Sequence, residues 1–315
     1  MKRGIKIDFN RAGITLTELL VAIVLVGLLM IGTFYVFSNF FSASFSQERY
    51  TLEQADTQVS AQFLKWDIFM TGYGMPASQF PISVQDNSGE NSSDILTLMS
   101  TSFGSGGNEG KWSYILSPVE NSTQITVRRW NDPELDIDEG EYITVLSPTK
   151  GQVGASVYQV TDRQTATGPA GQDAWTLTLN NIISTSLNFV FVVGSPTGPG
   201  TTIYYIQNGN LMRDSTVFIP GVVDFQLAFW IDTDGDRIQD AGETYNDLSI
   251  LAANPQFADN VKLIRVSIVT ATSGEENYVF SLDTIRTENN VLDVSSIGRN
   301  FRYDTWRNLV HPRNL

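Results

Sequence analysis

The chain has 315 residues, a formal net charge of −14, one histidine and no cysteine. The acidic balance argues against nucleic-acid binding, which needs a basic footprint, and a single histidine argues against histidine-based catalysis or a multi-histidine zinc site. Without disulfides, an exported domain of this size depends on its core, with metal ions as the other available support.

The first predicted element is an apolar helix behind a short basic leader. No charged side chain occurs from Leu19 to Phe45, a run longer than the roughly 20 residues that a helix needs to cross a bilayer. Basic residues before this run place the leader in the cytoplasm and the body outside it. Glu18 stands at the start of the run, where a carboxylate is costly in lipid unless something neutralises it. We therefore identify Glu18 as a candidate functional residue.

The residues around Glu18 resemble the type IV prepilin signal. They comprise a basic leader, a small residue (Gly13) at the cut and a glutamate at the fifth position of the mature chain. The resemblance implies that a prepilin peptidase cleaves after Gly13 on the cytoplasmic side and that the new amine on Ile14 is methylated. Families of this kind usually begin with Phe where this chain has Ile14. The alternative is an ordinary signal anchor with an incidental glutamate.

Cleavage before Ile14 would give Glu18 a specific physical role. It leaves an ammonium group four residues from Glu18, about one helical turn away. In a bundle of such helices, the amine of one subunit and the carboxylate of another neutralise each other. An unpaired charge in that setting is expensive, so this pairing is expected to drive docking and fix the axial register.

The helix is predicted to continue to about Thr71. The stretch from Gln47 to Met70 contains no Gly or Pro, and Gly72 and Gly74 end the pattern. Apolar residues recur at helical spacing, so we expect the second half to lay an apolar stripe on a globular head. The predicted stripe consists of Leu52, Ala55, Val59, Phe63, Leu64, Trp66 and Phe69.

From Ser78 onward, short alternating runs separated by Gly, Pro, Asn and Ser predict a β-rich head. The cleanest half-buried strand is predicted at Val223–Phe229, where apolar and other residues alternate. Asn208-Gly209 predicts a type I′ hairpin turn. An inserted subdomain is expected at residues 87–171. The other main strands are expected at Ile95–Met99, Gln124–Trp130, Tyr142–Leu146, Trp175–Leu179, Leu187–Val193, Ile203–Ile206 and Ile264–Ile268.

Type IV pilins share this arrangement, so the resemblance implies an α+β type IV pilin fold, with a long N-terminal helix packed on a β-rich globular head. The predicted parts are a cleaved leader (1–13), a transmembrane and filament-core helix (14–45), an amphipathic half of the helix (46–72) and a periplasmic or extracellular head (73–315).

Two later stretches resemble the PilW-like group of minor pilins. Residues Leu64–Gly74 look like its L-x-x-D-I-x-x-A-G-Y signature, with Thr71 in place of Ala. Residues Ile203–Arg213 look like its Y-Y-l-x-n-g-x-L-x-R hairpin, and Val217–Gln226 is similar to the strand that follows. The middle of the chain carries no such likeness.

The most specific polar pattern is the acidic loop from Asp232 to Glu243. Acids fall at positions 1, 3, 5, 9 and 12, with a carbonyl at 7, which is the ligand spacing of a calcium loop. Gly235 is at position 4 and Arg237 at position 6, where the usual loop has Gly. Crowded carboxylates repel one another unless a cation lies among them, so we expect Ca²⁺ rather than a solvated acidic turn. The predicted ligands are Asp232, Asp234, Asp236, Ile238, Asp240 and Glu243.

A second acidic run lies between positions 132 and 141. We interpret it as a solvated loop in preference to a metal site. Its members are Asp132, Glu134, Asp136, Asp138, Glu139 and Glu141.

The resemblance predicts a minor type IV pilin and not an enzyme. Such a protein waits in the inner membrane with its head outside the cytoplasm. It then primes or enters a filament through its N-terminal helix and presents a calcium-stabilised head near the tip at the cell surface. The expected partners are major and minor pilins, the prepilin peptidase and the inner-membrane assembly platform. The alternatives are a pseudopilin of a type II secretion system and a pilus-borne adhesin.

Overall fold

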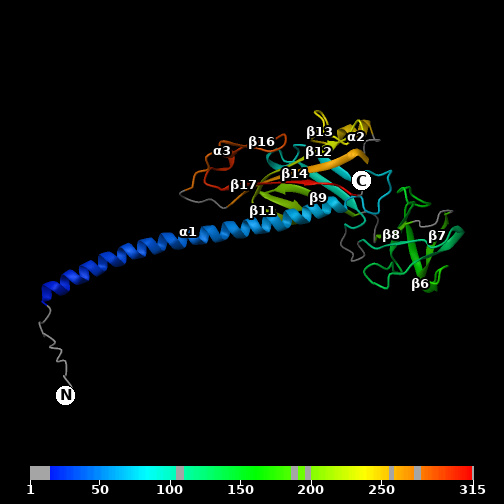
Figure 1. Ribbon diagram of the computed structural model, residues 1–315, viewed down its shortest axis with the longest axis horizontal. Helices are drawn as coiled ribbons and strands as arrows, with labels where there is room; N and C mark the ends of the chain where they lie inside the picture. Colours follow the sequence, from blue (N-terminus) through cyan, green and yellow to red (C-terminus); the bar gives the residue numbers. More distant parts are fainter. Residues whose placement is uncertain are drawn as a thin grey trace, which may run out of the picture. The chain divides into compact units, whose positions relative to one another are not determined.

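The structure is a computed structural model that describes residues 15–103, 110–185, 191–195, 200–254, 259–272 and 278–313 (Figure 1). The chain divides into two units, residues 1–56 and 57–315. A single helix, α1 (Leu16–Met70), contains the boundary between them. The long N-terminal helix and the β-rich head expected from the sequence are both present, which confirms the α+β class.

Helix α1 is 55 residues long and ends where the sequence predicts. Gly72 follows it with φ +80°, a left-handed conformation that glycine adopts at helix ends without steric cost. In the last turn the Thr71 hydroxyl donates to the carbonyl of Asp67 at 2.8 Å, which satisfies one of the free carbonyl groups there.

The face that α1 buries in the head differs from the predicted stripe. Ala61, Leu64 and Ile68 are buried, at helical spacing, and Leu64 and Ile68 join the main core of the head. Val59, Phe63 and Trp66 are instead 59%, 62% and 59% exposed. The predicted stripe is therefore confirmed at Leu64 and wrong at Val59, Phe63 and Trp66. This segment carries apolar residues on two faces, and periodicity alone does not say which face meets the sheet.

The main part of the head contains two antiparallel sheets around that core. Between β9 and β10, Asn208 and Gly209 have φ values of +52° and +68°, which confirms the predicted type I′ turn. The first sheet has the order β1 (Ile82–Gln85), β2 (Ile95–Ser100), β9 (Gly200–Gln207), β10 (Asn210–Arg213) and β11 (Thr216–Pro220). The second has the order β13 (Thr244–Tyr245), β12 (Val222–Ile231), β14 (Val261–Ala271) and β17 (Tyr303–Val310).

Strand β12 is buried on both faces, not half-buried as predicted. Asp224 and Gln226, on the face expected to be solvated, are 0% exposed. Two segments cover that face: the loop between β1 and β2, which includes a short 3₁₀ turn (Glu90–Ser92), and the turn of a separate hairpin. That hairpin consists of β15 (Thr284–Arg286) and β16 (Val291–Asp293); short helices lie at α2 (Ser249–Ala253) and α3 (Val294–Ile297).

A third sheet forms a lobe inserted between β2 and β9. Ser100 at the end of β2 pairs with Gly200 at the start of β9, so the chain leaves and re-enters the first sheet at one point. A bridge between Ile115 and Val127 joins the two ends of the strand order, which closes the sheet into a small barrel without long free edges. The order is β3 (Trp112–Tyr114), β8 (Phe191–Ser195), β5 (Tyr142–Leu146), β6 (Tyr158–Thr167), β7 (Asp173–Thr185) and β4 (Val119–Arg128).

This lobe has its own hydrophobic core, separate from the main one. Its limits correct the insertion expected at 87–171, because β2 belongs to the first sheet whereas β7 and β8 belong to the barrel. All the strands expected from the sequence overlap observed ones, although residues 187–190 of the strand expected at Leu187–Val193 lie outside the described residues.

Candidate functional site: the N-terminal helix, a polar clasp and two acidic segments

The described chain begins at Thr15, so the predicted cleavage residues Gly13 and Ile14 lie outside the described residues. Thr15 and Glu18 form a capping box at the start of α1. The Thr15 backbone N–H and hydroxyl both donate to Glu18 Oε2 at 2.9 Å, and the Glu18 N–H donates to Thr15 Oγ1 at 3.3 Å. The Thr-x-x-Glu spacing was visible in the sequence, but its capping role was not anticipated. Glu18 therefore has a local role in addition to the one predicted for it.

Among the described residues of its unit, the apolar run that follows Glu18 has no packing partner. Its large apolar side chains, from Leu16 to Phe45, are all more than half exposed. Phe37, Phe41 and Phe45 stack along one side of the helix, with ring centroids 6.1 and 6.4 Å apart. By length and composition this helix can cross a membrane. Such a surface needs lipid or other apolar helices to cover it.

Within the head, a polar clasp joins the last turns of α1 to the β9–β10 hairpin. Asp67 Oδ2 accepts hydrogen bonds from the Tyr204 hydroxyl at 2.5 Å and from Arg213 Nε at 2.9 Å, and Arg213 Nε lies 3.2 Å from the Tyr204 oxygen. Asp67 is 9% exposed and Tyr204 is 0% exposed. Burial, followed by the neighbouring Asp67 carboxylate, raises the pKa of Tyr204 well above its usual range, so the hydroxyl remains a donor.

The clasp brings two motifs that are far apart in the sequence into contact. Asp67 belongs to the Leu64–Gly74 stretch, whereas Tyr204 and Arg213 belong to the Ile203–Arg213 hairpin. Sequence reasoning quoted both stretches but did not connect them, because nothing in a single sequence says that residues so far apart are in contact.

The acidic loop brings together three of its predicted ligands. One carboxylate oxygen from each of Asp232, Asp234 and Asp236 lies within 4.8 Å of the other two. Asp232 is buried and accepts from the backbone N–H groups of Gly235 at 2.7 Å and Arg237 at 3.2 Å. Arg237, at position 6, has φ +64°, the left-handed conformation that Gly usually adopts at this position. Because arginine has a Cβ atom, this conformation is sterically less favourable for it than for Gly.

The structure does not bring Glu243 to this cluster. The Glu243 carboxylate accepts from the backbone N–H of Thr233 at 2.7 Å, its hydroxyl at 3.0 Å, the Trp230 indole N–H at 3.1 Å and the Asp240 N–H at 3.2 Å. These hydrogen bonds, with the Thr233 backbone N–H foremost, lower the pKa of Glu243 to about 2. Glu243 thus ties the two ends of the loop together. Asp240 donates its backbone N–H to Glu243. Ile238 donates its backbone N–H to Asp236 at 2.7 Å.

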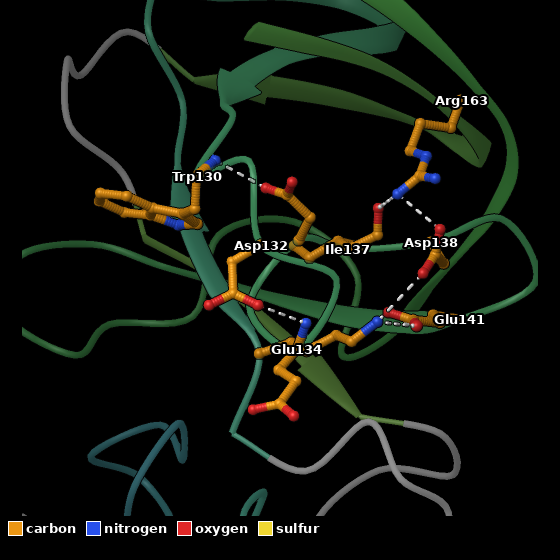
Figure 2. Close-up of polar contacts among 9 residues, drawn as sticks. Trp130, Asp132, Glu134, Ile137, Asp138, Glu141 and Arg163 are labelled. Atoms are coloured by element: carbon orange, nitrogen blue, oxygen red, sulfur yellow. Dashed lines mark hydrogen bonds and ion pairs between the residues drawn. The ribbon is translucent and has the colours of Figure 1, made fainter. Parts of the chain in front are cut away.

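The second acidic segment is only in part the solvated loop that the sequence predicted, since Glu134 and Glu139 are exposed but two of its other acids are buried. Asp136 and Glu141 are 5% exposed. Asp136 accepts from the backbone N–H of Trp130 at 2.7 Å, and Figure 2 shows Glu141 and Asp138 within the contacts of the barrel lobe. Lys111, itself 2% exposed, lies 2.7 Å from Glu141 and 3.2 Å from Asp138, and Arg163 pairs with Asp138. A buried ammonium group needs nearby carboxylates, and this segment supplies them.

The comparisons with known proteins point to the N-terminus. The prokaryotic N-terminal methylation motif matches residues 8–34. Among curated proteins, no relative of significant similarity is found. A solved type IV-like pilin from Thermus thermophilus aligns with 83% of this chain and 95% of its own chain, at 10% identity and with a TM-score of only 0.31. The methylation motif extends into the first half of the apolar helix α1, so this chain has the N-terminal motif and the apolar helix of type IV pilin-like proteins.

Proposed function

We propose that this chain is a minor pilin that enters or primes a type IV filament through its N-terminal helix. The observation that carries the proposal is the methylation motif joined to a continuous helix with uncovered apolar side chains. A filament core of similar helices would cover that surface, and the membrane would cover it before assembly. In this proposal the head lies outside the cytoplasm, and the partners are other pilins, the prepilin peptidase and the inner-membrane assembly platform.

A second observation supports assembly over simple anchoring. The apolar face formed by Val59, Phe63 and Trp66 is exposed beyond the run that would lie in lipid. Its spacing, i, i+4 and i+7, is that of an interface between helices. A chain that used α1 only as an anchor would have no use for this face.

Mass spectrometry of the protein isolated from its native membrane tests the proposal. We expect the mature chain to begin at Ile14, with its amine carrying one methyl group. A chain that keeps residues 1–13, or one trimmed beyond Phe45, would contradict the proposal, because no new terminus would then remain on the apolar helix. Deleting the gene for this chain separates the rival functions. Lost filaments indicate assembly, retained filaments with lost attachment indicate an adhesin, and lost secretion indicates a pseudopilin.

We further propose that the acidic loop binds Ca²⁺ through Asp232, Asp234 and Asp236. Three carboxylates within 4.8 Å repel one another, and a hard cation relieves that repulsion with the oxygen ligands it prefers. The role of the ion would be to stiffen the loop after export. At calcium concentrations a hundredfold above the dissociation constant, binding would stabilise the head by about 2.7 kcal/mol.

Terbium luminescence excited through tryptophan tests this site, since the Trp230 indole contacts the loop at Glu243. We expect Tb³⁺ to give a sensitised signal that Ca²⁺ displaces, and Asp236→Asn to weaken it by about tenfold or more. Asp240→Asn is the matched control, because Asp240 lies in the same loop but outside the cluster. A signal that survives Asp236→Asn and is lost in Asp240→Asn would contradict the assignment of ligands.

A further inference from the structure

A buried lysine lies between two carboxylates in the barrel lobe. Lys111, which immediately precedes β3, is 2% exposed, and its ammonium nitrogen lies 2.7 Å from Glu141 Oε1 and 3.2 Å from Asp138 Oδ2. Glu141 is buried with it, whereas the Asp138 side chain is 41% exposed. The lysine therefore has two carboxylates within hydrogen-bond distance and almost no access to water.

The main chain of the barrel fixes the positions of this lysine and of Glu141. The Lys111 carbonyl accepts from the N–H of Gly194 in β8 at 2.9 Å, and the Glu141 carbonyl accepts from the N–H of Val160 in β6 at 2.8 Å. A Cβ atom on Gly194 would lie 3.2 Å from Lys111 Cβ and 3.7 Å from Glu141 Oε2, so β8 passes close to both side chains. Groups held together in this way react with effective concentrations of up to about 10⁵–10⁸ M.

An ion pair alone leaves hydrogen-bonding groups at this site unmatched. A lysine ammonium has three N–H groups, and among the described residues Lys111 has two acceptors. Glu141 Oε2 is buried and accepts no hydrogen bond. A secondary amide at the lysine nitrogen would have one N–H, which Glu141 Oε1 is placed to accept. A buried carboxylate oxygen without a donor is also a place where a proton can be held during a reaction.

The two oxygens of Asp138 have different surroundings. Arg163 pairs with Oδ1 and also donates to the carbonyl of Ile137 at 3.1 Å, which fixes the guanidinium in place (Figure 2). Oδ2 faces the lysine nitrogen instead. A cation at Oδ1 stabilises negative charge that develops there when a nucleophile attacks the carboxyl carbon. Oδ1 is thus placed to remain as the carbonyl oxygen, and Oδ2 to leave.

We propose that Lys111 and Asp138 form an intramolecular isopeptide bond, with Glu141 as the residue that carries the protons. Glu141 accepts a proton from the ammonium group, and the freed amine attacks Cγ of Asp138. The Nζ–Cγ bond forms and the Cγ–Oδ2 bond breaks. Nζ gives up two protons in all, and both leave with Oδ2 as one water molecule. Nothing is oxidised or reduced, and the reaction needs no other reactant.

The bond would join the start of β3 to the segment before β5, across 27 residues of sequence. The chain has no cysteine, so this link would have the effect that a disulfide has elsewhere, which is to restrict the unfolded chain. It would also replace a buried positive charge by a neutral amide. This inference is independent of the filament role and of the acidic loop.

Mass spectrometry of the intact, denatured full chain, purified in detergent, tests the proposal. We expect a mass lower by one water molecule than the sequence of the isolated chain predicts, and one branched tryptic peptide that contains both Lys111 and Asp138. Lys111→Arg and Glu141→Gln are expected to have the full mass. In Asp138→Asn the amine would displace ammonia instead of water, so the product is expected to be identical in mass to the cross-linked wild-type chain.

Four results would count against the proposal. A wild-type chain of full mass would overturn it and leave an ion pair only. A link mapped to Glu141 would overturn the choice of Asp138, and a loss of water that persists in Lys111→Arg would exclude the lysine. A link that forms as completely in Glu141→Gln would overturn the role of Glu141. The wild-type measurement remains decisive even if a variant does not fold.

Discussion

Replacing Asp67 by Ala is expected to lower the free energy of unfolding of the head by about 2–4 kcal/mol, since it leaves the buried Tyr204 hydroxyl without its acceptor and breaks an ion pair whose Arg213 side is partly exposed. The loss is large because Asp67 accepts both hydrogen bonds on one oxygen, within a region where Tyr204 is fully buried. Denaturant unfolding of the full chain, followed by tryptophan fluorescence, measures it.

Companion variants separate the parts of this clasp. Tyr204→Phe removes one hydrogen bond and is expected to cost about 1–3 kcal/mol. The double variant Asp67→Ala with Arg213→Ala is expected to cost less than the sum of the two single changes, because the charges leave together. Asp56→Ala is the matched control: an exposed acid on the same helix, expected to change stability by less than about 0.5 kcal/mol. If Asp67→Ala behaves like Asp56→Ala, the clasp does not stabilise the head.

Replacing Glu18 by Gln is expected to reduce incorporation into filaments by about tenfold or more, while leaving N-terminal processing intact. This prediction rests on the proposed function. In a bundle of apolar helices, the amine of Ile14 on one subunit would lose the carboxylate of another, and an unpaired charge there costs several kcal/mol. The ratio of the chain in sheared filaments to that in the membrane measures the effect, with mass spectrometry of the terminus as the check on processing.

Glu18→Gln is informative because it separates charge from capping. A glutamine at this position can still accept from the Thr15 N–H, so the capping box survives while the charge is lost. Thr15→Ala does the opposite, since it removes the hydroxyl and keeps the carboxylate. The charge hypothesis expects Gln to fail and Thr15→Ala to assemble. The reverse result would mean that Glu18 matters only as a helix cap.

The two acidic segments have a similar density of carboxylates in the sequence but different surroundings in the structure. In the 232–243 loop, the carboxylates of three aspartates lie close together, whereas the Glu243 carboxylate accepts four hydrogen bonds from Trp230, Thr233 and Asp240. In the 132–141 segment, Asp138 and Glu141 form ion pairs with the buried Lys111, which precedes them by more than 25 residues in the sequence. Which group a carboxylate contacts depends on which strands pack together. The number of acidic residues in a segment does not predict that contact.

The sequence by itself determined the features that depend on neighbours along the chain. These are the length and end of α1, the motif around Glu18, the type I′ turn at Asn208-Gly209 and most of the strands, all of which follow from local periodicity and from the backbone preferences of Gly and Asn. Tertiary structure alone decided that Leu64 and Ile68, and not Phe63 and Trp66, face the sheet, because both faces of that segment are apolar. It also decided that β12 is covered on both faces and that Asp67 meets Arg213, because such contacts form only when segments far apart in the chain compete for the same buried surface.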